Sequence, residues 1–169
     1  FFLVTKDQGT PDRGITSRVM WGLQTSVANG EWSYLQKDNS KNKGTNWFGA
    51  VEQMSVSVAM QQNRMSNTGS ATGRNHGITF YNQWQNAFAT RPKIITLTWW
   101  NEWGAERLDP STNVACGTYC FTDNYNQEYS RDIEPQKGGL GSTYYDWTTQ
   151  YIRAYKNHQS VPRLVESGY

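Results

Sequence analysis

The apolar positions along the chain follow two periods in alternation. Over residues 52–60, apolar side chains fall at every second position, which predicts a β-strand. After Thr79, the expected N-cap, large aromatic side chains recur at every fourth position until Pro92 ends the pattern. This spacing predicts a helix with one buried face. The residues expected on that face are Phe80, Trp84, Ala87 and Phe88.

Further strand-like and helix-like segments flank this helix. The chain opens on a short apolar strand over residues 1–5. Residues 94–100 form an apolar run without alternation, which is typical of a strand buried on both faces of a parallel sheet. A last helix is expected to begin at Ser142. Its buried face is expected to hold Tyr144, Thr148, Tyr151, Ile152 and Tyr155.

This order of strands and helices predicts an α/β fold, either a doubly wound sheet or part of a (β/α)8 barrel. A full barrel needs about 250 residues, so 169 residues correspond to half to two-thirds of one. We assign residues 1–158 to this partial barrel, and 159–169, which show no period, to a tail or the start of a linker. A half-barrel would expose an apolar side that needs cover from its missing half or from another chain.

Composition narrows the function classes. The chain holds 8 Trp and 10 Tyr, and only 18% of its residues are charged. Its net charge of +2 comes from scattered Lys and Arg and indicates no nucleic-acid partner, and no apolar run approaches the ~18 residues of a membrane span. Neither a phosphate-binding loop nor a metal-ligand spacing occurs, so we expect no cofactor and no metal. Trp with amides and carboxylates favours carbohydrate, because indole rings stack on the apolar faces of pyranoses.

The sharpest candidate site directly follows the apolar run. Glu102 and Glu106 lie just past its end, where α/β barrels place their chemistry. Neighbouring indoles would exclude water and raise the pKa of one carboxyl, which then serves as a general acid, while the other carboxylate acts as base or nucleophile. Alternatively, Arg107 pairs with an acid and the group only caps the core. The expected substrate-binding residues here are Trp99, Trp100, Asn101 and Trp103.

A second polar cluster occupies residues 121–135. Dense polar side chains without a helical period need mutual hydrogen bonds or a ligand. One interpretation is a structural ion pair of Arg131 with Asp132 or Glu134. The other is a sugar subsite, in which Arg131 and Asp132 bind substrate and Glu134 is a further catalytic candidate.

Two smaller features leave alternatives open. Cys116 and Cys120 either close a small disulfide loop, which would indicate an oxidising compartment, or remain two thiols. Arg74 and His76 precede a predicted helix, where they either bind an anion or simply form a turn.

The segment Trp100-Asn101-Glu102-Trp103-Gly104 resembles the signature of glycoside hydrolase family 99/71-like barrels and their WbsX-like relatives. Residues 128–139, which include Ile133-Glu134-Pro135, are most similar to a segment of largely uncharacterised secreted bacterial members of this clan. The likeness touches most of residues 1–156 in order. It implies the C-terminal half of a (β/α)8 barrel, with a missing N-terminal half, in a secreted, cell-surface or periplasmic protein.

The resemblance also implies a function and carries one departure. In family 99, two glutamates in Glu-x-x-Glu act together on α-mannosides; Glu102 matches the first, but Ala105 stands in place of the second, and Glu106 is one residue late. From the resemblance and the match at Glu102 we expect a glycoside hydrolase with Glu102 as general acid or base. The alternative is a non-catalytic glycan-binding or structural extracellular protein on a decayed barrel. The WbsX likeness further suggests polysaccharide biosynthesis.

Overall fold

The fold is described from a computed structural model of the chain. The structure describes residues 39, 44–45, 51–59, 72–98, 100–101, 107–108, 120–121 and 126–169. Its strands are β1 (Gly44–Thr45), β2 (Val51–Ser57), β3 (Ile94–Thr98), β4 (Arg107–Leu108) and β5 (Cys120–Phe121). Its helices are the short 3-10 turn η1 (Asn75–Gly77), α1 (Ile78–Thr90) and α2 (Thr143–Lys156).

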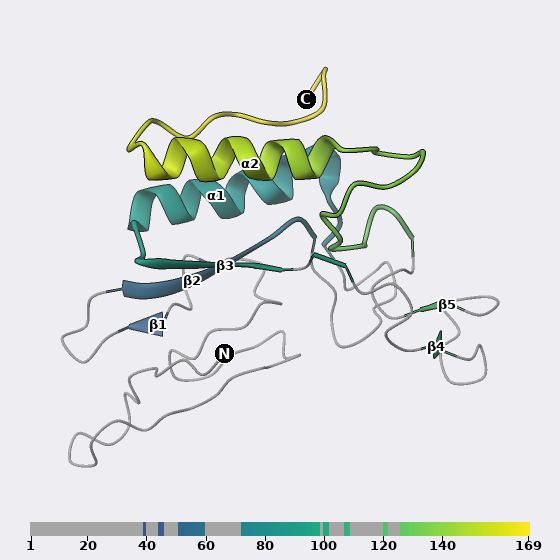
Figure 1. Ribbon diagram of the computed structural model, residues 1–169, viewed down its shortest axis with the longest axis horizontal. Coiled ribbons are helices and arrows are strands. Elements are labelled where there is room, and N and C mark those ends of the chain that lie inside the picture. Colours follow the sequence, from purple (N-terminus) through teal and green to yellow (C-terminus); the bar gives the residue numbers. More distant parts are fainter. Residues whose placement is uncertain are drawn as a thin grey trace, which may run out of the picture.

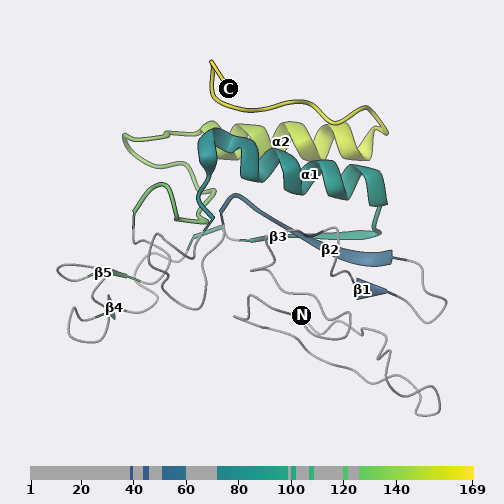
Figure 2. The same ribbon diagram turned by 180° about the vertical axis from the view of Figure 1, so that it is seen from behind.

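The main sheet has the strand order β1-β2-β3. Its strands β2 and β3, with helix α1 between them in the chain, form a β-α-β unit. β1 runs antiparallel to β2, whereas β2 and β3 are parallel, with Gln53 opposite Ile94 and Ser57 opposite Thr98. Helix α1 connects the two parallel strands, and both α1 and α2 lie on the same side of the sheet (Figures 1 and 2). β4 and β5 form a separate antiparallel pair. A parallel β-α-β unit belongs to doubly wound sheets and to barrels alike, so the partial barrel stays a prediction.

The core lies between the sheet and the two helices. Met54, Val56 and Val58 are fully buried there, which confirms one core face for the described part of the 52–60 segment; Met60 lies outside the described residues. Across from them, the aromatic face of α1 packs against α2, and the rings of Trp84 and Tyr151 stack with their centroids 5.0 Å apart. The predicted burial of Phe80, Trp84 and Ala87 is confirmed, and Phe88 is partly buried.

Both helices differ from the expectation at single residues. α1 begins after Gly77, so Thr79 is not the N-cap; its hydroxyl instead donates to the carbonyl of Gly73 at 2.6 Å. α2 begins at Thr143, one residue after the expected start, with Ser142 as its N-cap. Ile152, however, is exposed, and Ala154 takes its place on the buried face of that helix.

The expectation that the 94–100 run is buried on both faces is wrong for its described part. Ile94 is 50% exposed and residues 95–97 are only partly buried, whereas every described side chain of β2 from Gln53 onward is buried. β3 is at one edge of the described sheet, so one of its sides has no partner strand among the described residues. The face of β2 away from the helices is polar, and Gln53 donates from Nε2 to the hydroxyl of Thr96 at 2.7 Å.

The C-terminal segment packs onto the helices. It runs along their side away from the sheet (Figures 1 and 2), and Val161 and Leu164 contact the core. The backbone N–H of Glu166 donates to the carbonyl of His76 at 2.9 Å. Residues 159–166 therefore extend the folded unit beyond α2. Within the described part of the chain, neither helix has the length and apolar character that a membrane crossing requires.

Candidate functional site

The carboxyl ends of β2 and β3 meet at one edge of the sheet because the two strands are parallel. The chain leaves β3 toward Trp100 and Asn101, and here the loop before α2 joins it. The carbonyl of Trp100 accepts two backbone hydrogen bonds, from the N–H of Ile133 at 3.2 Å and from that of Glu134 at 3.0 Å. The fold thus brings together parts of the two polar segments that the sequence singled out separately.

A side-chain hydrogen bond tightens this junction. Nδ2 of Asn101 donates to Oε2 of Glu134 at 2.6 Å, and both residues are partly buried. A carboxylate that accepts a hydrogen bond from a fixed amide is held in one orientation. Glu134 is therefore an oriented carboxylate at the strand edge, although the sequence alone ranked it behind Glu102 and Glu106.

Trp100 lies at the same junction and is open to solvent. Its side chain is 50% exposed, and its ring meets that of Tyr145, which is 39% exposed, at a centroid distance of 6.0 Å and an angle of 78°. Sequence reasoning missed Tyr145. Two adjacent tyrosines open α2, and side chains one residue apart point about 100° away from each other on a helix. With Tyr144 in the core, Tyr145 had to point elsewhere.

Arg131 and Asp132 lie inside the supporting loop. Both are buried, and so is Ser130, whose hydroxyl accepts from the N–H of Asp132 at 3.2 Å. The carbonyl of Asp132 accepts from Nη2 of Arg74 at 2.8 Å. This burial favours a role in holding the loop over direct contact with a ligand.

Arg74 is the centre of that support. It is buried, donates from Nε to the carbonyl of Gln127 at 2.9 Å, and its guanidinium lies 4.3 Å from the centroid of the Tyr144 ring. Burial raises the pKa of Tyr144 to about 12, and the positive charge of Arg74 opposes this shift without cancelling it. The guanidinium of Arg74 thus supports the loop through backbone carbonyls and an aromatic face, and anion binding at this helix start stays a prediction.

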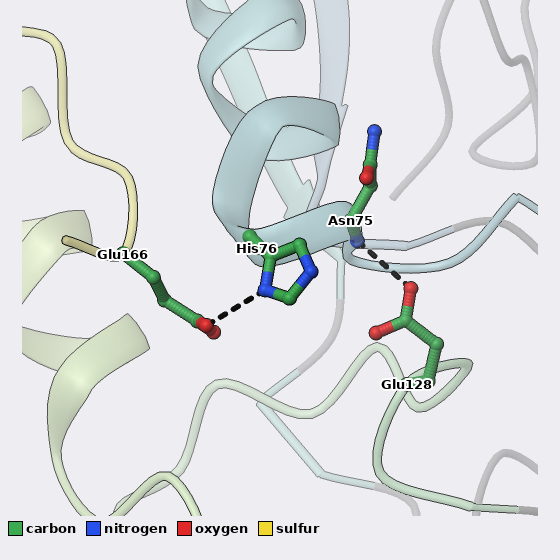
Figure 3. Close-up of polar contacts among 4 residues, drawn as sticks. All are labelled: Asn75, His76, Glu128 and Glu166. Atoms are coloured by element: carbon green, nitrogen blue, oxygen red, sulfur yellow. Dashed lines mark hydrogen bonds and ion pairs between the residues drawn. The ribbon is translucent and has the colours of Figure 1, made fainter. Parts of the chain in front are cut away.

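The turn before α1 is held from both sides (Figure 3). The N–H of Asn75 donates to Oε1 of Glu128 at 2.9 Å, while Nδ1 of His76 lies 2.9 Å from Oε2 of Glu166. The ring of His76 also stacks on that of Tyr169, with centroids 3.7 Å apart. His76 thus fastens the C-terminal segment to the turn.

The other predicted site residues lie outside the described part of the chain. These are Trp99, Glu102, Trp103, Glu106 and Cys116; Arg107 and Cys120 are described only through the backbones of β4 and β5. The described side chains contain no group of three or more His, Cys, Asp or Glu that could hold a metal ion.

Comparison with protein-family models, curated proteins and solved structures found no match. The geometry around Trp100, Asn101 and Glu134 is therefore the basis for assigning a function.

Proposed function

We propose that this chain acts on a polysaccharide or glycan as a glycoside hydrolase, with its site at the carboxyl end of β3. The hydrogen bond from Asn101 to Glu134 carries the proposal, because it fixes a carboxylate to the residue that directly follows the exposed Trp100 at the strand end. In the same proposal the chain is the C-terminal part of a (β/α)8 barrel similar to the family 99/71-like clan. We further propose that the protein works outside the cytoplasm, where it encounters such polymers.

The proposed chemistry needs two carboxyl groups with different roles. One protonates the leaving oxygen of the glycosidic bond, and the other activates water or attacks the sugar directly. Glu102 is the proposed general acid or base, and it directly follows Asn101 in the chain. Glu134, which Asn101 orients, is the proposed second carboxylate in place of Glu106. This pairing supplies the second acid that the family pattern would have put at Ala105.

The surroundings support carbohydrate as the substrate class. The exposed face of Trp100 offers a stacking surface for the C–H groups of a pyranose ring, and the partly buried Asn101 and Glu134 offer polar atoms for hydroxyl groups. Apolar stacking with a few polar groups is the combination that binds sugars. No charged ligand is implied by these groups.

A second candidate function is glycan binding without cleavage. The departure at Ala105 favours it, because the Glu-x-x-Glu pair of family 99 is incomplete in this chain. The same residues, Trp100 and Asn101, would then bind sugar while neither carboxylate performs chemistry.

Turnover on a panel of soluble polysaccharides separates these functions. Glu102→Gln and Glu134→Gln should each lower kcat by at least about 100-fold, since each removes a proton-transferring group. Glu166→Gln is the matched control, because this partly exposed glutamate lies on the C-terminal segment, and it should cleave like the unmodified chain. Binding without cleavage would leave only the second function. Neither binding nor cleavage of any glycan would overturn both.

A further inference from the structure

Tyr145 lies beside Trp100 and has no role in the hydrolytic chemistry. We infer that Tyr145 extends the stacking surface of Trp100 into a second saccharide subsite, next to the one that Trp100 forms with Asn101 and Glu134, so that the site binds a neutral oligosaccharide chain rather than a single sugar. This inference rests on the proposed function and adds the length and charge class of its substrate.

Exposure singles out this aromatic pair. Among the described Phe, Trp and Tyr side chains, three are exposed: Trp100, Tyr145 and Tyr169. Tyr169 covers one ring face by stacking on His76. Trp100 and Tyr145 instead meet nearly at right angles, at 78°, an arrangement in which the edge of one ring contacts the other and ring surface stays open to solvent. Two large exposed rings side by side are typical of a binding surface.

The backbone that carries each ring is held before any ligand arrives, and the two rings contact each other. The backbone of Trp100 is tied to the loop by the N–H groups of Ile133 and Glu134. Tyr145 belongs to the first turn of α2, where the hydroxyl of Ser142 donates to Oδ2 of Asp146 at 2.6 Å. A preformed aromatic surface loses little conformational entropy on binding, which favours affinity from stacking alone.

The position of the pair makes the second subsite contiguous with the first. Trp100 and Asn101 are consecutive in the chain, and both contact Glu134. The carbonyl of Trp100 accepts a hydrogen bond from the backbone N–H of Glu134, and the side chain of Asn101 donates one to its carboxylate. In this inference, a sugar unit stacked on Trp100 and bound by Asn101 and Glu134 has its neighbour in the glycan over Tyr145. A neutral glycan fits best, because the carboxylate of Glu134 would repel the carboxylate of a uronic acid.

Affinity as a function of glycan length tests the inference. The full chain is titrated calorimetrically with neutral gluco-, galacto- and manno-oligosaccharides of increasing length and with one oligouronide. We expect affinity to rise with length in one neutral series, with the oligouronide binding more weakly. Tyr145→Ala should abolish that rise and weaken the longer members by about 10-fold, while leaving the shortest bound member unchanged. Tyr145→Phe should bind like the unmodified chain.

The controls keep the outcomes distinct. Ile152→Ala changes another exposed apolar residue of α2 and should bind like the unmodified chain. If Tyr145→Ala binds the longer oligosaccharides as tightly as the unmodified chain while Trp100→Ala does not, the second subsite is wrong and the proposed function stands. Tighter binding of the oligouronide contradicts the neutral class. If no saccharide binds the unmodified chain, both proposals fail.

Discussion

Asn101 donates a hydrogen bond from Nδ2 to Oε2 of Glu134 across 2.6 Å and joins two segments that lie 33 residues apart in the chain. The bond couples the end of β3 to the loop before α2. Since both residues are partly buried, the bond combines restricted water access with a fixed carboxylate orientation.

Replacing Asn101 by Ala should separate function from stability. The variant loses one partly exposed hydrogen bond to a charged group, which costs about 1 kcal/mol of unfolding free energy. Turnover should fall by at least about 10-fold, because the Glu134 carboxylate is no longer oriented. Urea unfolding measured beside kcat/KM checks both values. Unchanged kcat/KM in a folded variant would contradict the role assigned to Asn101.

Burial of Tyr144 predicts loss of stability at alkaline pH. Its pKa is raised from 10.0 to about 12 in the folded chain by burial, which the Arg74 charge only partly offsets, and burial also raises the pKa of Tyr151. The unfolded chain releases the phenol proton at a lower pH than the folded chain does. The contribution of protonated Tyr144 to the free energy of unfolding is therefore complete below about pH 10 and is lost as pH rises toward 12. The loss from Tyr144 amounts to about 2–3 kcal/mol.

Urea unfolding between pH 8 and pH 12 measures this slope. Tyr144→Phe removes one of the raised tyrosine titrations, so its unfolding free energy should fall less steeply above pH 10. Equal slopes for the variant and the unmodified chain would show that Tyr144 does not titrate as its burial requires.

Gly77 is required at the start of α1 for two reasons. Its φ is 91°, and a Cβ at this position would lie 2.6 Å from Cζ3 of Trp147. Gly77→Ala should therefore cost about 2–4 kcal/mol, as the sum of left-handed backbone strain and a steric clash. Gly138→Ala is the matched control, because Gly138 has φ of 76° with open space around it. Thermal unfolding should show the smaller loss for Gly138→Ala; equal losses would remove the Trp147 clash as a cause.

Two apolar residues on the paired strands should respond differently to truncation. Met54 is fully buried against the helices, so Met54→Ala should cost about 2–5 kcal/mol. Ile94 is half exposed at the outer strand, so Ile94→Ala should cost less than about 1 kcal/mol in the isolated chain. Chemical unfolding compares the two. A large cost at Ile94, or one that appears only with a second chain added, would indicate that another segment or chain covers this edge.

Periodicity was sufficient to predict the two long helices and the alternating strand, because the buried faces of these elements repeat at 3.6 or 2 residues. It failed at Ile94, since an apolar run does not specify whether a neighbouring strand is present at its edge. It also could not place Thr79, because the conformation of Gly77 decides where the helix begins. The contact between Asn101 and Glu134 depends on the path of the long loop between them, and no local pattern encodes that path.

The aromatic residues illustrate the same limit. Trp84 and Trp100 are chemically identical, and the helical repeat identified the buried one. The exposure of Trp100 follows from its position beyond the end of β3, and that of Tyr145 from the burial of Tyr144 beside it. Sequence composition favoured carbohydrate, whereas three-dimensional placement indicates which of these rings a sugar can reach.

The most direct test of carbohydrate binding at this edge is the indole N–H resonance of Trp100 in a two-dimensional NMR spectrum, assigned with Trp100→Phe. Titration with soluble oligosaccharides should shift the Trp100 signal progressively and saturably. The signal of Trp84, which is buried in the core, serves as the internal reference and should stay in place. An unmoved Trp100 signal at saturating concentrations of every glycan tested would contradict the proposed site.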